Sequence, residues 1–241
     1  MVKLLFLINL HMKKYLLFLI FTSCCFSQIK SGNVTYNYQI GYDQVLSNDA
    51  YLKNMTESAQ IGAKKISFNL EFNSKSSLFK LNDYITDDDI DLAIAFSNAT
   101  TSYFYDIILN VKTMNIDNFT GQYIVNYFEK TPWKIENETK YIGEYLCYKA
   151  TAEQIVENSK GTFKHPITAW YCPSIPFNFG PKGYSDLPGL ILELQIRNIT
   201  WGATRIELSN ENKIIEKPTK GRLITEEEYK KLLSSPILLR N

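Results

Sequence analysis

VTYNYQIGY, residues 34–42, alternates apolar and polar side chains, and ISFNLEF, residues 66–72, does the same. A period of two places one set of side chains on a buried face and the other in solvent, so both segments are predicted strands. Rougher runs of the same kind follow at 77–81, 101–109, 122–128, 133–136, 145–151, 168–172, 190–197 and 204–209. So many short strands predict a mainly β, antiparallel sheet.

Two short helices are predicted beside the strands. The first covers residues 49–59. The second lies at the C-terminus and has the clearer signal, because Thr225 can cap the amide of Glu228 while Glu228 reaches back to Thr225. Acids at 226–228 and lysines at 230 and 231 also suit the two ends of the helix dipole.

Composition describes one ordinary globular domain. The chain has 241 residues, of which 45% are hydrophobic and 21% charged, and 26 basic residues balance 25 acidic ones. A net charge of +1 gives no electrostatic footprint for nucleic acid and no polybasic patch for a membrane. The sequence shows no internal repeat and no second domain.

The first 27 residues predict export. The run MKK at 12–14 precedes the apolar segment 15–21 and the mostly small residues 22–27, which is the layout of a signal peptide beginning at Met12. Lysines at 13 and 14 interrupt the apolar stretch, so no transmembrane segment is expected after processing. The mature domain is then 28–241, in the periplasm or associated with the outer membrane. A lipobox ending at Cys24 is the alternative to a soluble mature form.

Processing leaves two cysteines, Cys147 and Cys172. In an oxidising compartment a pair of this kind favours one disulfide. The predicted turn 158–161 has the same midpoint as the two cysteines, so a simple hairpin places the thiols opposite each other. Pro166 lacks a ladder donor and favours a bulge, which would shift that register. Two free buried thiols are the alternative.

Residues 173–189 form the most unusual segment, with four of the eight prolines and three glycines. Such a stretch cannot be helix or inner strand, and its prolines can make it rigid. One hypothesis is a preorganised aromatic binding loop, and the other is a loop folded back over the open end of the sheet. The candidate binding residues are Phe177, Phe179, Gly180, Pro181, Tyr184, Leu187, Pro188 and Gly189.

The sequence LPGLILE at 187–193 resembles the signature of the GLPGLI family of secreted proteins from Gram-negative bacteria. WKI at 133–135, IGEYLCYKA at 142–150 and ITEE at 224–227 also match the layout of that family. Asp186 stands where the family has its opening glycine. The resemblance implies an envelope location and a strongly curved sheet or half-barrel, similar to periplasmic lipoprotein carriers. It implies no reaction.

Catalytic patterns are absent from the sequence. One histidine in the mature chain, His165, cannot make a zinc-protease motif, and the glycines fit neither phosphate-loop nor dinucleotide spacing. DDDID at 87–91 could offer carboxylates to a cation, but it lacks the glycine and the distal glutamate of a calcium loop and is interpreted as a solvated acidic turn. No catalytic residue, metal or cofactor is predicted.

Three functions follow as hypotheses. The favoured one is a non-catalytic binding or accessory module of the cell envelope that holds an apolar ligand or an outer-membrane partner protein. The second is a periplasmic carrier or chaperone for lipidated proteins, which needs a deep apolar cavity. The third is a hydrolase with an unrecognised site. The sequence does not indicate an oligomeric state.

Overall fold

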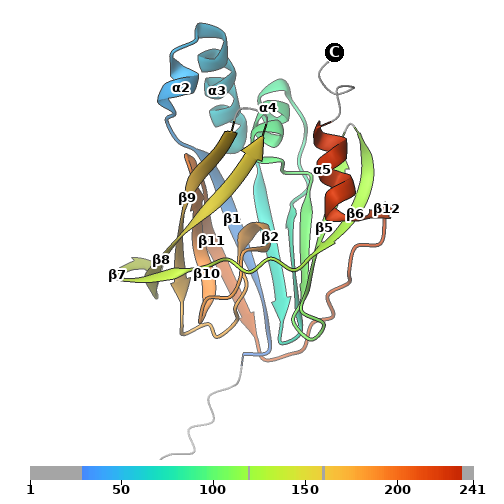
Figure 1. Ribbon diagram of the computed structural model, residues 1–241. Coiled ribbons are helices and arrows are strands. Elements are labelled where there is room, and N and C mark those ends of the chain that lie inside the picture. Colours follow the sequence, from blue (N-terminus) through green and yellow to red (C-terminus); the bar gives the residue numbers. More distant parts are fainter. Residues whose placement is uncertain (1–28, 119, 159–160, 235–241) are drawn as a thin grey trace, which may run out of the picture.

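The computed structural model describes residues 29–118, 120–158 and 161–234 (Figure 1). The predicted signal peptide and the alternative lipidation site at Cys24 lie outside the described residues. The described chain forms a single sheet with its helices gathered at one end and one edge. None of its helices is long and apolar enough to cross a membrane.

Twelve strands make up the sheet in the order β12-β6-β5-β4-β3-β2-β1-β11-β10-β9-β8-β7. Their bounds are β1 Ser31–Ile40, β2 Ser67–Asn73, β3 Ser76–Leu81, β4 Ser102–Asp106, β5 Val111–Asn118, β6 Gly121–Tyr127, β7 Lys134–Ile142, β8 Tyr145–Asn158, β9 Gly161–Cys172, β10 Leu190–Ile196, β11 Ile199–Ser209 and β12 Arg222–Ile224. The sheet is mainly antiparallel as predicted. The prediction of antiparallel pairing fails at β12, which pairs with β6 in parallel.

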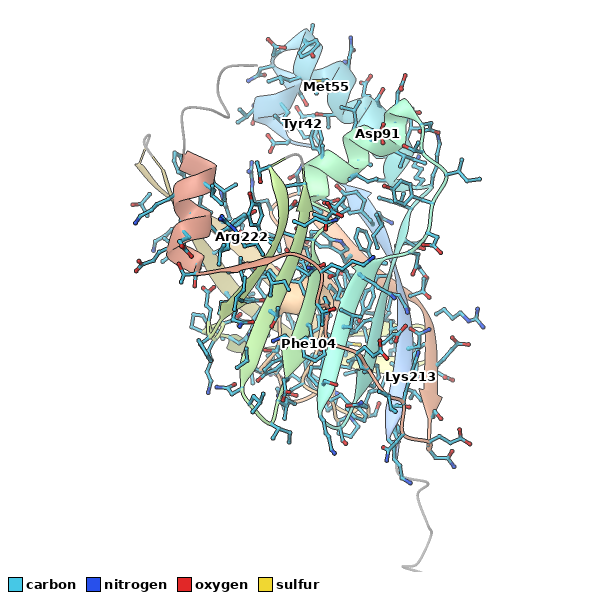
Figure 2. The ribbon with its side chains drawn as sticks, turned by 90° about the vertical axis from the view of Figure 1, so that its right-hand side faces the viewer. Tyr42, Met55, Asp91, Phe104, Lys213 and Arg222 are labelled. Carbon is cyan, nitrogen blue, oxygen red and sulfur yellow. The ribbon has the colours of Figure 1, made fainter. Side chains whose placement is uncertain are left out.

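The parallel pair follows from the path of the chain after β11. Residues 210–221 run across the outer face of the sheet, over Phe104, before the chain enters β12 at Arg222 (Figure 2). The side-chain amide of Asn73 donates to the backbone carbonyl of Lys213 at 2.7 Å, and that of Asn115 donates to the backbone carbonyl of Lys220 at 2.6 Å. The crossing brings the chain to the free edge of β6 in the same direction as that strand.

The alternating strands behave as the sequence predicts. Val34, Tyr36, Tyr38 and Ile40 of β1 are buried on the inner face of the sheet, and the residues between them are more exposed. Phe68, Leu70 and Phe72 do the same in the neighbouring strand β2. These side chains form the centre of the main hydrophobic core.

The β8–β9 hairpin confirms the predicted register. Asn158 pairs with Gly161, and Tyr148 pairs with Tyr171, one position inside the two cysteines. Pro166 pairs with Glu153 without shifting the ladder, so the bulge considered at that position does not occur. The register shift that β9 does carry lies on its other side, against β10, between Ile191 and Glu193.

Four α-helices are described, α2 Gln44–Ser47, α3 Ala50–Ala63, α4 Asp88–Ser97 and α5 Glu226–Ser234. The capping box of α5 is confirmed, because the Glu228 amide donates to Thr225 Oγ1 at 3.1 Å and the Thr225 amide donates to the Glu228 carboxylate at 2.7 Å. The prediction of a solvated acidic turn at 87–91 is wrong, because these residues form the start of α4. Asp87 caps that helix by accepting from the Ile90 amide, and Lys65 pairs with Asp87 and Asp89.

The inner face of the sheet is largely filled by residues 173–189. Ile175, Phe179 and Leu187 are almost completely buried there. Phe177 packs on Phe72 with ring centroids 4.8 Å apart. The segment therefore folds back into the concave side of the sheet, as the second of the two hypotheses for it predicts.

Candidate functional site

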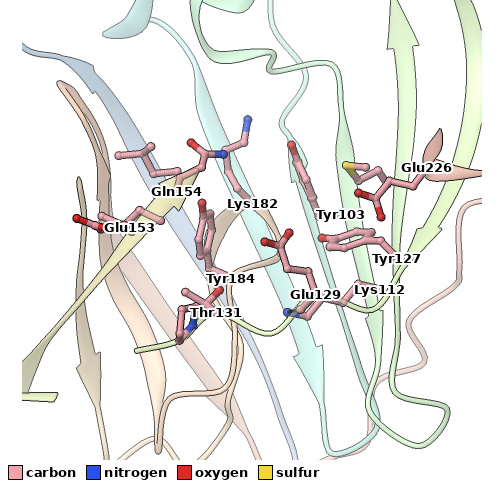
Figure 3. Close-up of a pocket in the computed structure, with 15 residues that line it drawn as sticks. Tyr103, Lys112, Tyr127, Glu129, Thr131, Glu153, Gln154, Lys182, Tyr184 and Glu226 are labelled. Atoms are coloured by element: carbon pink, nitrogen blue, oxygen red, sulfur yellow. Dashed lines mark hydrogen bonds between the residues drawn. The ribbon is translucent and has the colours of Figure 1, made fainter. Parts of the chain in front are cut away.

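A cavity of about 220 Å³ remains on the inner face beside this filling segment (Figure 3). Its walls come from β4, β5 and β6 on one side, from β8, β9 and β10 on the other, and from the connection between β6 and β7, which crosses between them. Strands far apart in the sheet order thus meet around one space, which requires strong curvature of the sheet. The short helix η1, Pro181–Gly183, and Tyr184 supply one wall.

Three tyrosines line the cavity, and each comes from a different element. Tyr103 lies on β4, Tyr127 on β6, and Tyr184 directly after η1. Within the described part of the chain, no side chain or backbone group forms a hydrogen bond with any of these three hydroxyls. Burial raises the pKa of all three phenols, and their mutual proximity and the nearby Glu129 carboxylate add to the effect at Tyr127 and Tyr184. The hydroxyls are therefore protonated and available to a ligand near neutral pH.

Gly183 makes room for this arrangement. A Cβ atom at this position would lie 2.5 Å from the Tyr127 hydroxyl and 3.2 Å from the Tyr103 ring. The backbone at Gly183 also has φ +75°, a conformation that side chains disfavour. Both constraints keep the floor of the cavity free of a side chain.

The Glu129 carboxylate is the acidic group at the centre of the view in Figure 3, between Tyr184 and Tyr127. Among the described residues it makes no ion pair within 4 Å. The other two carboxylates of the lining already have partners, because Glu153 pairs with Lys164 at 3.1 Å and Glu226 with Lys230 at 2.7 Å.

Lys112 is a buried cation on β5 at the base of the cavity. Its Nζ donates to the Glu129 backbone carbonyl at 2.9 Å and lies 3.4 Å from the Asp186 carboxylate. Burial lowers the pKa of Lys112, and the Asp186 charge opposes that shift. Asp186 has φ +72°, a left-handed backbone conformation that glycine adopts more readily than aspartate. Its carboxylate also accepts a hydrogen bond from Ser185 Oγ at 2.9 Å.

Lys182 is the second cation of the lining. Its Nζ donates to the Ser97 carbonyl at the C-terminus of α4, at 2.7 Å, where a positive charge suits the helix dipole. The same nitrogen lies 5.3 Å from the ring centroid of Tyr103 and 5.4 Å from that of Trp201. Burial lowers the pKa of Lys182 to about 8.

Cys147 and Cys172 lie side by side as two free, buried thiols. The predicted disulfide is not formed in the structure, although the predicted register brings the two side chains together. Cys147 Sγ donates to the Tyr145 carbonyl at 3.5 Å. The interaction between the two sulfurs raises the pKa of Cys147 and lowers the pKa of Cys172 to about 6. Cys172 Sγ also lies 3.0 Å from Ser174 Oγ.

The predicted binding loop divides between core and cavity. Phe177, Phe179, Gly180, Pro181, Leu187 and Gly189 are buried, and Pro188 is exposed. Gly189 has φ +152°, and a Cβ atom there would lie 2.3 Å from the Cys172 carbonyl, which explains the glycine. Of the predicted residues, Tyr184 lines the cavity. The two predicted phenylalanines do not present an exposed docking surface.

His165 and the acidic stretch lie elsewhere. His165 pairs with Gln154 in the β8–β9 hairpin and borders an open depression with Asp43 and Arg197. Within the described ranges, no three His, Cys, Asp or Glu side chains are grouped so that they could hold a metal ion.

A family model described as a protein of unknown function (Porph_ging) matches residues 133–166 and 158–193 of the chain. These segments include β7, the β8–β9 hairpin, the loop 173–189 and the start of β10. They contain most of the motifs on which the resemblance to the GLPGLI family rests, but the description of the model does not carry that name. No curated protein matches the chain.

Among solved structures, the chain is similar to PNGF-II in two crystal forms. The structure in space group C2 is 16% identical with a TM-score of 0.52, and the match covers 85% of this chain and 32% of that one. The structure in space group P21 is 15% identical with a TM-score of 0.51, covering 84% of this chain and 33% of that one. The chain thus spans about a third of the PNGF-II chain, and at this identity the likeness shows the fold alone.

Proposed function

We propose that the protein is an exported, non-catalytic binding module that holds a small polar ligand, or the polar head of a larger one, in the cavity on the inner face of its sheet. The observation that carries the proposal is the set of three tyrosine hydroxyls that face one cavity without a hydrogen-bond partner among the described residues. The three residues are only partly buried, so their hydroxyls are open to a polar ligand that displaces water from the cavity and forms hydrogen bonds with them.

The lining changes the chemistry expected from the sequence. An apolar ligand would cover the phenol hydroxyls without offering them hydrogen bonds, which is costly. A carrier of lipidated proteins needs a deep apolar cavity, whereas here Phe179, Ile175 and Leu187 occupy that space. The remaining 220 Å³ lies below the range of about 300 to 1,000 Å³ that is usual for sites that bury a drug-sized ligand.

Export remains part of the proposal and is supported by the N-terminal sequence. The signal-like segment at 12–27 and the resemblance to a secreted family both favour an envelope location. A non-catalytic role is supported by the sequence, which carries no zinc-protease, phosphate-loop or dinucleotide motif.

The cavity can be tested by blocking it. Thr131 lies on the connection that crosses the mouth of the cavity, so Thr131→Trp should fill the space. Thr139→Trp places the same ring on an exposed position of β7 and is the matched control. Saturation-transfer NMR with separate pools of ammonium, neutral hydroxylated and carboxylate fragments should show one pool that binds wild type and the Thr139 variant but not the Thr131 variant. Binding of no pool, or equal binding to the Thr131 variant, would refute the proposal.

A further inference from the structure

Two charged groups of the lining have no ion pair within 4 Å in the described chain: the Glu129 carboxylate, at an exposed position, and the Lys182 ammonium. Lys112 is engaged by Asp186 and by the Glu129 carbonyl, and Lys182 donates to the Ser97 carbonyl. The Glu129 carboxylate feels the charge of Lys112 but has no ion pair within 4 Å in the described chain. A ligand entering the cavity thus meets one carboxylate that is free to pair with it. The Lys112 ammonium is paired with Asp186, and the Lys182 ammonium, which has no carboxylate partner, is directed to the Ser97 carbonyl.

The aromatic walls of the cavity favour a positively charged ligand. The face of a tyrosine ring carries negative electrostatic potential and attracts cations, most strongly where water is excluded. The protein already places a cation against one of these rings, since Lys182 Nζ lies 5.3 Å from the Tyr103 centroid. Several aromatic rings around one carboxylate form the kind of cage in which proteins bind organic ammonium groups.

The hydroxyls are compatible with this ligand. Their raised pKa keeps Tyr103, Tyr127 and Tyr184 neutral, so they add no repulsive charge, and each phenol oxygen can accept a hydrogen bond. A protonated primary amine has three N–H donors to offer them, and a quaternary ammonium offers methyl groups to the rings. An anion would face Glu129 directly.

Building on the proposed function, we propose that the cavity is a cage for an organic ammonium group, with Tyr103, Tyr127 and Tyr184 as walls and Glu129 as counter-charge. The ligand is an amine or quaternary ammonium compound whose cationic head fits the cavity. The remainder of a longer ligand extends past the mouth beside Thr131.

The test compares a cation with its neutral isostere. Choline and 3,3-dimethylbutan-1-ol have nearly the same shape and differ in charge, and ethanolamine provides the primary ammonium. Titration calorimetry on wild type should give choline an affinity at least about tenfold above that of the neutral alcohol. Glu129→Gln should reduce this preference to about threefold or less. Glu216→Gln, at an exposed position of the segment that crosses the outer face, should leave it unchanged.

Two substitutions at Tyr127 separate the ring from the hydroxyl. Tyr127→Leu should lose choline binding, and Tyr127→Phe should keep choline binding but weaken ethanolamine binding if the phenol oxygen accepts from the amine. Equal affinity of choline and the neutral alcohol in wild type would overturn the ammonium cage. If the neutral alcohol or a carboxylate binds and Thr131→Trp abolishes that binding, the cavity is a binding site for another class of ligand. If nothing binds, both proposals fail.

Discussion

The concave side of the sheet has two halves that the same segment, residues 173–189, completes in opposite ways. In its first part, Phe177 packs against Phe72 and Phe179 packs against Tyr105 in the apolar core. Its η1 turn and Tyr184 instead help to enclose a polar cavity with Tyr127 and Glu129. The concave face therefore keeps a small polar cavity next to the packed half, and the packed half holds the cavity walls in place. The comparison predicts that changes in the packed half reduce stability and that changes in the open half alter binding.

The largest effect is expected at Phe179, the buried ring of the packed half. Phe179→Ala removes a side chain that is 1% exposed, and it should lower the free energy of unfolding by about 3 to 4 kcal/mol. Phe128→Ala removes the same atoms from a position that is 68% exposed and should change stability by less than about 0.5 kcal/mol. Denaturant unfolding of both variants measures the difference. Similar losses in the free energy of unfolding for the two variants would show that the packing of Phe179 does not stabilise the core.

The junction between the two halves depends on the Lys112–Asp186 pair. Asp186→Asn keeps the shape of the side chain but leaves the buried Lys112 ammonium without its counter-charge, at a cost of about 2 kcal/mol. Asp83→Asn makes the same change at an exposed position and should be nearly neutral. Thermal unfolding of the two variants measures the cost, and a neutral Asp186 variant would show that the pair is not needed.

The smallest effect concerns Lys182 and the pH dependence of the open half. Its pKa of about 8 means that the ammonium loses its proton between pH 7 and 9, and a positive charge then disappears from the lining. The affinity for choline, whose charge is fixed, should rise about two- to threefold over that range.

Other titratable groups around Lys182 allow this effect to be isolated. Tyr103 packs against it and stays neutral because its pKa is raised, whereas Lys112 has a lowered pKa and could add to the change. Lys182→Met removes the titrating amine and should flatten the profile. A profile that is unchanged in this variant would assign the pH dependence to another group.

Much of the fold could be predicted from local sequence. Strict alternation defined the strands around Tyr36 and Phe68, and the turn at 158–161 set the register of the hairpin. The Thr225–Glu228 pair marked the last helix. β5 was missed because Lys112 interrupts its apolar face, and the charge of that lysine is compensated by Asp186, which lies 74 positions away.

The cavity could not be predicted because its residues meet only through the curvature of the sheet. Tyr103, Tyr127 and Glu129 lie in or beside strands that looked ordinary, and only Tyr184 belonged to a segment that the sequence singled out. Asp87 followed by acids in the next turn is the signature of a helix start, so the start of α4 is a feature that the local sequence does carry.

The most direct measurement of the central claim is an NMR titration of the protein, labelled in its tyrosine rings, with choline. The ring signals of Tyr103, Tyr127 and Tyr184 should shift together with one dissociation constant. The signals of Tyr42, Tyr51 and Tyr141, which are at least 70% exposed, should stay in place. Shifts confined to the exposed tyrosines, or none at saturating choline, would contradict an ammonium site in the concave cavity.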